Sequence, residues 1–322
     1  MNTDSDLSST TRKAQRQANT TGISCVVVTY NPECPRFQRL LDAVSPQVDR
    51  IFVVDNGSNA QTLQWLAPMG ERPGVHWIPL ERNLGIASAL NVGIARALEV
   101  HSSHVLLLDH DSIPAADMVA QLRTAAESLS GKHALAAIGP RYIDERQANP
   151  PPFIRVEGLR LVRCQCRDEG DVVPVDYLIS SGSLIPAETL RLVGGMAEEL
   201  FIDYVDIEWG LRARQHGYQS FGVCAAHMEH DLGDAPVQFL GRQIPLHSPL
   251  RHYYHMRNAV SLYLRSDFPT QWKLVDGWRL LLKYGFYSLL VPSRWQHFSM
   301  MTRGIWHGLR GKLGPLPQRS RT

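Results

Sequence analysis

The chain alternates short β-branched runs with helix-like segments over its first 110 residues, and this alternation constrains the fold more than any other feature. Four apolar runs have the length of one strand each: 23–29, 51–54, 75–80 and 104–109. Between them, apolar residues recur at helical spacing, as in the segment 37–44, and Asn83 is the predicted N-cap of a helix ending at Val100. The pattern predicts an α/β domain with a mostly parallel central sheet flanked by helices.

Polar side chains cluster where three of these strands end. Thr29 and Asn31 close the first strand, Asp55 opens an Asp-Asn-Gly-Ser segment after the second, and Asp109 and Asp111 follow the fourth. One such cluster is ordinary turn chemistry. Because ligands of α/β sheets bind at the carboxyl ends of the strands, three clusters at corresponding ends are expected to converge on one binding rim.

A divalent metal site is predicted at this rim. Asp109 and Asp111 stand two apart after a buried strand, and their hard oxygens suit Mg²⁺ or Mn²⁺. His230 follows a later strand-like run, 218–226, and could complete the site. The alternatives are a helix N-cap for Asp111 and a structural or surface role for His230.

A second group of acids lies among apolar residues further along the chain. Asp203, Asp206 and Glu208 alternate with apolar side chains, so partial burial could raise a carboxyl pKa, as a general base requires. Acids that compensate a helix dipole would give the same pattern. Tyr254 and Arg257 stand three apart, share a helix face and suit a diphosphate.

Charge is divided unevenly between the body and the C-terminal part. Residues 251–322 hold twelve Lys or Arg against two Asp or Glu, which leaves the first 250 residues at about −8 within a total of +2. Four of the seven tryptophans lie in the same basic segment. Basic and aromatic residues together favour a membrane surface over nucleic acid. The alternative is a solvated basic face with tryptophans in the core.

The segment 272–289 is the expected membrane contact. Six apolar residues fall on one side of the predicted helix: Trp272, Val275, Trp278, Leu282, Phe286 and Leu289. Lys273, Asp276 and Lys283 fall elsewhere, and the uninterrupted apolar stretch is too short to span a bilayer. At the other end, residues 1–22 have no apolar signal region and are predicted to be a disordered lead-in. The five scattered cysteines are expected to be reduced thiols in the cytoplasm.

Several motifs, taken in order, resemble the family 2 glycosyltransferases of the GT-A fold. They are Val28-Thr-Tyr-Asn31, Val54-Asp-Asn-Gly-Ser58, Arg82-Asn-Leu-Gly85, Leu108-Asp-His-Asp-Ser112, Ser180-Ser-Gly-Ser183 and the block 194–212. The segments 201–209 and 253–258 look most like the rhamnosyltransferase branch. The resemblance implies a GT-A nucleotide-diphospho-sugar transferase domain over 23–265, with a donor half, 23–150, and an acceptor half, 151–265. A basic, Trp-rich helical tail, 266–322, then follows as a membrane-associating extension.

The resemblance also assigns roles to the donor-side residues. Thr29, Asn31 and Asp55 would line the nucleotide pocket, with Asn83 and Gly85 as its floor. Tyr254 and Arg257 would add donor contacts. Asp109 and Asp111 match the D-x-D motif that binds the ribose and the metal-bound diphosphate, and His230 matches a histidine that closes the metal site in some members.

For catalysis, the resemblance points to the block around Asp206. Asp206 aligns with the first Asp of the E-D-x-D motif and would be the base. Val205 stands in place of the Glu and Glu208 in place of the second Asp, so Glu208 is the alternative base. Ser181 and Trp209 are expected on the acceptor side.

The function implied is an inverting transfer of L-rhamnose from dTDP-rhamnose to a polyprenyl-diphosphate-linked glycan in O-antigen or capsular polysaccharide synthesis. Such an enzyme would use Mg²⁺ or Mn²⁺ and work at the inner face of the cytoplasmic membrane, with no nucleic-acid partner. The alternatives are a sugar-phosphate nucleotidylyltransferase and a non-catalytic nucleotide-sugar or glycan binding protein. A nucleotidylyltransferase would normally carry a Gly-rich loop after the first strand, where Thr-Tyr-Asn-Pro-Glu stands instead. A dinucleotide oxidoreductase is disfavoured because no G-x-G-x-x-G follows that strand.

Overall fold

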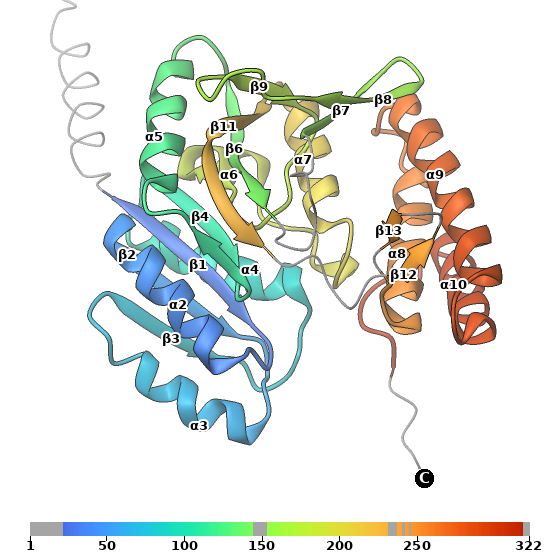
Figure 1. The fold of residues 1–322 in the computed structure, drawn as a ribbon, viewed down its shortest axis with the longest axis horizontal. Helices are drawn as coiled ribbons and strands as arrows, with labels where there is room; N and C mark the ends of the chain where they lie inside the picture. The colour runs from blue at the N-terminus through green and yellow to red at the C-terminus, as the bar shows by residue number, and fades with distance from the viewer. Residues whose placement is uncertain (1–21, 144–152, 231–236, 240–241, 245, 318–322) are drawn as a thin grey trace, which may run out of the picture.

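A mixed nine-stranded sheet forms the centre of the computed structural model, which describes residues 22–143, 153–230, 237–239, 242–244 and 246–317 (Figure 1). The strand order is β3-β2-β1-β4-β10-β6-β11-β5, and β9 pairs with β11. The strands are β1 (Ile23–Thr29), β2 (Arg50–Asp55), β3 (Val75–Pro79), β4 (His104–Asp109), β5 (Ser112–Pro114), β6 (Leu135–Ile143), β9 (Val172–Val175), β10 (Leu184–Pro186) and β11 (Gln219–His230).

The first four strands pair in parallel, at positions within one residue of those predicted. The register sets Thr29 beside Asp55, and Val28 beside Asp109. From β10 onward, antiparallel pairs join the sheet. Periodicity marks a strand but not its partner, because pairing depends on contacts between distant segments.

Helices cover both faces of the sheet. The face that carries Cys25 and Val27 packs against α2 (Cys34–Val44), α3 (Ala60–Met69) and α5 (Met118–Leu129). The face that carries Val26 and Val28 packs against α4 (Ile86–Glu99), α6 (Ala187–Val193) and α7 (Val205–Gln215). Strand residues alternate between two buried faces, which explains their unbroken apolar runs.

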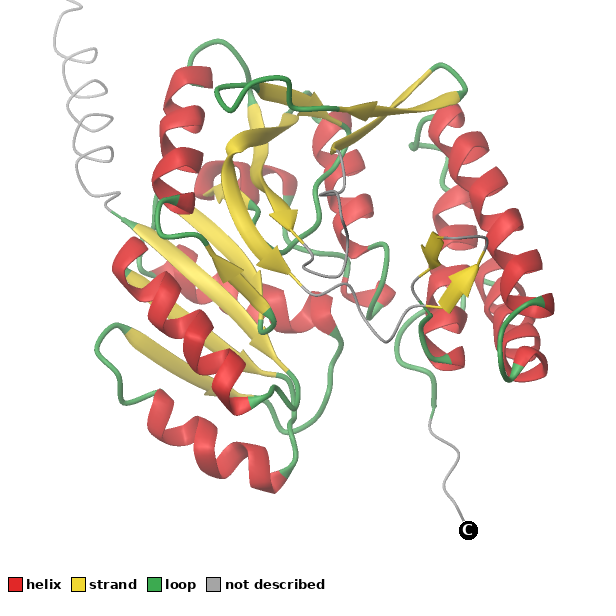
Figure 2. Ribbon diagram, in the orientation of Figure 1, coloured by secondary structure: helices red, strands yellow, loops and turns green. Residues whose placement is uncertain are grey.

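The C-terminal helices belong to the folded body. They are α8 (Pro249–Leu264), α9 (Thr270–Leu289) and α10 (Arg294–Leu309), grouped beside the sheet in Figure 2. Met256, Trp272 and Met301 lie in the same hydrophobic cluster as Val26. The placement of Trp272 on a lipid-facing side is therefore wrong: it is 2% exposed and packs edge-on against Tyr204. Within the described residues, no helix combines the length and apolarity needed to cross a bilayer.

Smaller elements complete the chain. They are η1 (Ser45–Gln47), η2 (Glu198–Leu200) and two hairpins, β7 (Phe153–Glu157) with β8 (Arg160–Cys164), and β12 (Val237–Phe239) with β13 (Arg242–Ile244). The predicted lead-in, apart from residue 22, and the predicted boundary near residue 150 lie outside the described residues.

The cysteines depart from the prediction of reduced thiols. Cys166 and Cys224 form a disulfide, while Cys25, Cys34 and Cys164 are free. The two bonded residues are 58 positions apart. Their approach is set by the fold, which sequence spacing does not reveal.

Candidate active site

The loops after β1 and β2 are locked together at the carboxyl edge of the sheet. Asp55 is fully buried, and its carboxylate accepts hydrogen bonds from the Thr29 hydroxyl at 3.0 Å and from the Ser58 amide and hydroxyl at 3.0 and 2.5 Å. The Asn31 amide donates to the Ser58 hydroxyl at 2.8 Å, and the Asn31 side-chain oxygen accepts from the Asn59 amide at 2.9 Å. The convergence predicted for these strand ends is confirmed.

The loop before α4 joins this edge. The Asn83 side-chain oxygen accepts from the Asn56 side chain at 3.1 Å and from the Gly85 amide at 2.9 Å. Gly85 caps α4 in place of Asn83, the predicted N-cap, because its φ of 90° turns the chain into the helix. A Cβ on Gly85 would lie 2.5 Å from the Phe201 carbonyl oxygen, which accepts from the Ile86 amide. Close backbone contact with the segment before α7 thus requires glycine here.

The Asp109–Ser112 turn is held by side chains from two other segments. The buried Ser181 hydroxyl accepts from the Asp109 amide at 3.0 Å and lies 2.7 Å from the Ser112 hydroxyl. Arg36 donates to the Asp111 carbonyl through Nε at 3.0 Å and Nη2 at 2.7 Å. Ser181, predicted on the acceptor side, thus holds the Asp109–Ser112 turn through its hydroxyl. Sequence reasoning missed Arg36, which has no motif of its own.

His230 reaches the same turn through its backbone. In the β11–β5 register it pairs with Ser112, next to Asp111, and its side chain lies outside what the structure describes. In the part of the chain that is described, no three His, Cys, Asp or Glu side chains gather closely enough to hold a metal ion.

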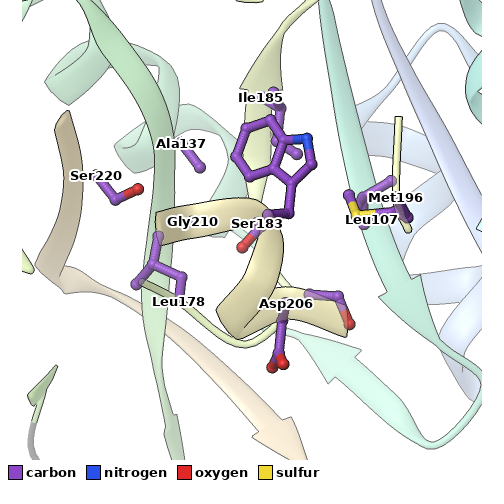
Figure 3. Close-up of a pocket in the computed structure, with 11 residues that line it drawn as sticks. Leu107, Ala137, Leu178, Ser183, Ile185, Met196, Asp206, Gly210 and Ser220 are labelled. Atoms are coloured by element: carbon purple, nitrogen blue, oxygen red, sulfur yellow. The ribbon is translucent and has the colours of Figure 1, made fainter. Parts of the chain in front are cut away.

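Asp206 stands in the first turn of α7 and borders a small pocket (Figure 3). Burial is the main cause that raises the pKa of Asp206 to about 6. The charges of Asp203 and Asp109 act in the same direction, and a hydrogen bond from the Ile207 amide acts against it. Leu107 of β4 lines the same pocket, so β4 and the start of α7 face one region. The pocket is lined by Leu107, Ala137, Leu178, Ser180, Ser183, Ile185, Met196, Asp206, Trp209, Gly210 and Ser220.

Trp209 forms part of the wall of this pocket. Its indole is buried and donates to the Gly194 carbonyl at 2.9 Å, which ties α7 to the glycine-rich segment before it. The predicted acceptor-side residue thus lies in the same pocket as Asp206.

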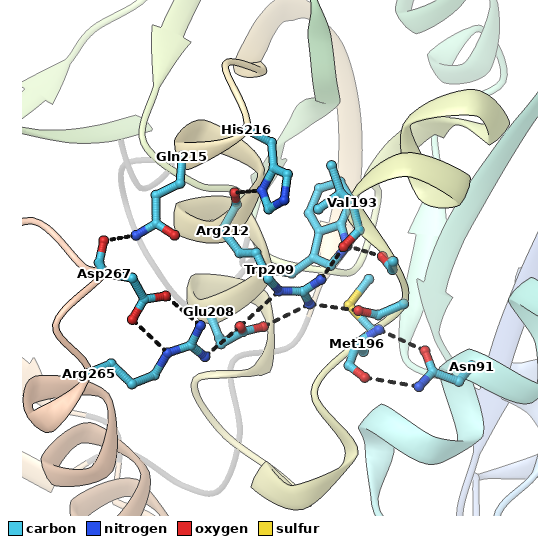
Figure 4. A network of polar contacts seen from close by, with 12 residues as sticks. Asn91, Val193, Met196, Glu208, Trp209, Arg212, Gln215, His216, Arg265 and Asp267 are labelled. Atoms are coloured by element: carbon cyan, nitrogen blue, oxygen red, sulfur yellow. Dashed lines mark hydrogen bonds and ion pairs between the residues drawn. The ribbon is translucent and has the colours of Figure 1, made fainter.

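Glu208 has a different environment from Asp206, although the two residues lie two positions apart in the first turn of α7. Glu208 is 1% exposed, and its carboxylate binds Arg212 at 2.9 and 3.0 Å and Arg265 at 2.9 Å (Figure 4). Both of its oxygens are therefore engaged in ion pairs. The geometry favours Asp206 over Glu208 as the base.

Tyr254 and Arg257 fill structural positions in place of the predicted donor contacts. The Tyr254 hydroxyl accepts from the Leu316 amide at 2.7 Å. Arg257 is 1% exposed, and its guanidinium donates to the carbonyls of Leu200, at 2.8 Å, and Gly314. A buried guanidinium needs such partners, and here backbone oxygens supply them where a diphosphate was expected.

Asn258 is a residue that sequence reasoning missed. It is fully buried in α8, and its side-chain amide donates to the carbonyls of Leu200, Ile202 and Asp203 at 2.9, 2.7 and 2.9 Å. The sequence did carry a signal for it. Asn is unfavourable inside a helix, and burying its amide among apolar residues costs free energy unless the amide is hydrogen-bonded. Phe201, Asp203 and Tyr204 all have φ between 64° and 67°, so Asn258 braces a strained backbone.

Comparison with solved structures shows a GT-A-like α/β fold. A mannosyltransferase from Pyrobaculum calidifontis, solved with GDP-Man and Mn²⁺, superposes with a TM-score of 0.52 at 15% identity, over 95% of each chain. At this identity the likeness concerns the fold alone.

Sequence comparison identifies the family. Residues 24–177 match the model of glycosyl transferase family 2. The dTDP-rhamnosyl transferase RfbF of Shigella flexneri is 35% identical over 77% of this chain and 81% of its own length. An N-acetylglucosaminyl-diphospho-decaprenol L-rhamnosyltransferase of Mycobacterium tuberculosis is 28% identical over 67% of this chain and 79% of its own length. The chain belongs to glycosyl transferase family 2, and the predicted resemblance to its rhamnosyltransferases is confirmed.

Proposed function

We propose that this glycosyltransferase moves L-rhamnose from dTDP-rhamnose onto a polyprenyl-diphosphate-linked glycan in O-antigen or capsular polysaccharide synthesis, with inversion. The observation that carries the proposal is the position of Asp206, a carboxyl in the first turn of α7 that borders a pocket also lined by Leu107 of β4 and whose pKa is raised by burial. The names of the two relatives support the sugar, the nucleotide and the lipid carrier.

Asp206 acts as the general base. An acceptor hydroxyl attacks the anomeric carbon of the donor from the side opposite the nucleoside diphosphate. The new carbon–oxygen bond forms as the bond to the diphosphate breaks, the diphosphate leaves with the electron pair, and Asp206 takes the hydroxyl proton. With a pKa of about 6, Asp206 is mostly ionised at pH 7 and able to accept this proton. A single displacement inverts the anomeric centre.

The donor binds along the carboxyl edge of the sheet. We assign the nucleotide to the loops that carry Thr29, Asn31 and Asp55, with Asn83 and Gly85 beneath it. Hydrogen bonds already join these loops to each other, so the pocket is preorganised before the donor arrives.

Asp109 and Asp111, with His230, would hold Mg²⁺ or Mn²⁺. The donor set fits, because two hard carboxylates on a turn fixed by Ser181 and Arg36 leave the remaining positions to diphosphate oxygens. The ion would offset the charge that develops on the leaving diphosphate. A structural neighbour was solved with Mn²⁺, which supports the assignment.

We further propose that α9 and α10 contact the inner face of the cytoplasmic membrane, where a lipid-linked acceptor resides. Exposed apolar side chains gather on these helices and their connection: Leu274, Trp278, Leu281, Leu282, Leu289, Leu290, Trp295, Phe298, Trp306 and Leu309. Trp278 is 62% and Trp295 74% exposed, and Arg279, Arg294 and Arg310 are exposed among them. Large apolar patches mark interaction sites, and basic residues favour an anionic lipid surface.

Flotation with vesicles of anionic lipid tests the membrane contact. The Trp278→Ser, Trp295→Ser double variant should lose most of its binding, whereas Leu159→Ser, which removes an exposed apolar residue of the β7–β8 hairpin, should float like the native protein. Equal flotation of all three proteins would refute the assigned surface.

Transfer assays test the reaction itself. Calorimetry in Mg²⁺ should give tighter binding of dTDP-rhamnose than of UDP- or GDP-sugars. Asp206→Asn should bind the donor almost as well as the native chain but lose roughly 10²–10⁴-fold in turnover. Native-like turnover in that variant would remove Asp206 as the base.

A further inference from the structure

Helix α9 presents two chemically different faces. Its outer stripe carries Leu274, Trp278 and Leu281, all more than half exposed. Its inner stripe, spaced three and four residues apart, is Trp272, Asp276, Leu280, Lys283 and Tyr287. Two charged side chains, Asp276 and Lys283, therefore face the protein while Leu274 and Leu281 face outward. Turning a carboxylate inward costs desolvation energy, so Asp276 needs strong partners there.

The partners of Asp276 are two tyrosine hydroxyls. Tyr204 and Tyr263 donate to the same carboxylate oxygen, at 2.7 and 2.6 Å. Burial, reinforced by the negative charge of Asp276, raises the pKa of Tyr204 well above its ordinary value. The Tyr204 hydroxyl therefore stays protonated and donates at every working pH.

Tyr204 is the residue through which α9 reaches the active site. It is 4% exposed, and it caps α7 with its φ at 64°, a left-handed conformation that costs a non-glycine residue energy. Its carbonyl accepts the Glu208 amide and opens the helix two residues before Asp206. The ring packs edge-on against Trp272 of α9 and His255 of α8, and the hydroxyl adds a charge-assisted hydrogen bond to Asp276.

We propose that Asp276 is a positioning residue: through Tyr204 it holds the first turn of α7 so that Asp206 faces the acceptor hydroxyl. The inference rests on the proposed role of Asp206 as the base. It makes α9 part of the catalytic apparatus, with one face toward the membrane surface and the other toward the residue that caps the catalytic helix.

Three single substitutions test the proposal in the full chain with dTDP-rhamnose. Tyr204→Phe keeps the ring contacts and removes only the hydroxyl, and Asp276→Ala removes the acceptor. Both should lower kcat roughly tenfold at unchanged KM for the donor, since small displacements of a catalytic group are costly. Asp276→Asn retains an acceptor oxygen and should recover most of the loss. Combining Tyr204→Phe with Asp276→Ala should lower kcat no further than the worse single variant.

The pH profile separates positioning from loss of stability. A loosened first turn would expose Asp206 to water, so the acid limb of kcat should move to lower pH in Tyr204→Phe. The matched control is Tyr263→Phe, which removes the second hydroxyl from the same oxygen and leaves Tyr204 bonded. Its kcat and acid limb should stay within about twofold and a few tenths of a pH unit of native.

Native kcat in folded Tyr204→Phe and Asp276→Ala, or the same kcat loss in Tyr263→Phe as in Tyr204→Phe, would overturn the positioning role. Asp206→Asn separates the role of Asp276 as a positioning residue from the role of Asp206 as the base. If Asp206→Asn is inactive while Tyr204→Phe behaves like native protein, only the positioning role is lost. If Asp206→Asn is active, the assignment of the base itself fails.

Discussion

The carboxyl edge of the sheet and the C-terminal helices both supply polar residues to the active-site region, but in opposite ways. At the edge, side chains bond to near neighbours in adjoining loops, as Asp55 does with Thr29 and Ser58. In the helices, Arg257 and Asn258 reach more than fifty residues back along the chain to backbone carbonyls before α7. In the proposed mechanism, residues at the edge bind the donor, and the helices hold the backbone segment before Asp206, the proposed base. Substitutions in the two regions should therefore separate activity from stability.

The largest effect is expected in the helices. Trp272→Ala should lower the free energy of unfolding by about 3–5 kcal/mol, because it leaves a cavity among Tyr204, Tyr263 and Phe268. Trp278→Ala, on the outer face of the same helix, should change it by less than about 0.5 kcal/mol. Chemical denaturation measures both. Similar losses in the two variants would contradict the assignment of inner and outer faces.

At the edge, Asp111→Ala should reduce turnover in Mg²⁺ by roughly a hundredfold, because it removes a carboxylate from the proposed metal site. Its unfolding free energy should stay near the native value. Donor binding should weaken only when a divalent ion is present, which calorimetry with and without chelator determines. An equal loss in chelator would argue for a contact that needs no metal.

Arg257→Lys tests whether Arg257 binds the donor diphosphate, as predicted, or only supports the backbone through the observed contacts. Lysine keeps the charge but cannot reach Leu200, Gly314 and Asn258 together, so stability should fall by about 2 kcal/mol. The KM for the donor should not change. A raised KM at native stability would restore the diphosphate role.

The smallest effect concerns the pH dependence of stability. Because the folded pKa of Asp206 lies near 6, above its ordinary carboxyl value, the fold loses stability as pH rises from about 4 to about 6, and the full cost is present above pH 6. Asp206→Asn should therefore be more stable than the native chain by about 1–2 kcal/mol at pH 8. The difference should shrink as pH falls through 6 and vanish below about pH 3, where the carboxyl is protonated in both states. Thermal unfolding at the two pH values provides the check.

Burial explains why some assignments from sequence succeeded and others did not. Thr29, Asp55 and Asp109 were predictable together, because parallel strands that end in polar residues must end at one edge. Arg257 and Tyr254 were placed on the correct helix face, but spacing does not tell whether that face meets a ligand or a backbone. The motif match favoured Asp206 but left Glu208 as the alternative base, and the two arginines around Glu208 give the structural difference between them.

The sequence by itself determined the alternation of strands and helices, the convergence of the strand-end carboxylates and the family, because these follow from periodicity and short motifs. Tertiary structure alone decided that α9 turns Asp276 and Lys283 inward and Leu274 and Leu281 outward. It also decided that Asn258 supports the backbone segment before α7. The physical reason is that a polar side chain is stable inside wherever a matching donor or acceptor lies, and that partner is set by contacts between residues far apart in the chain.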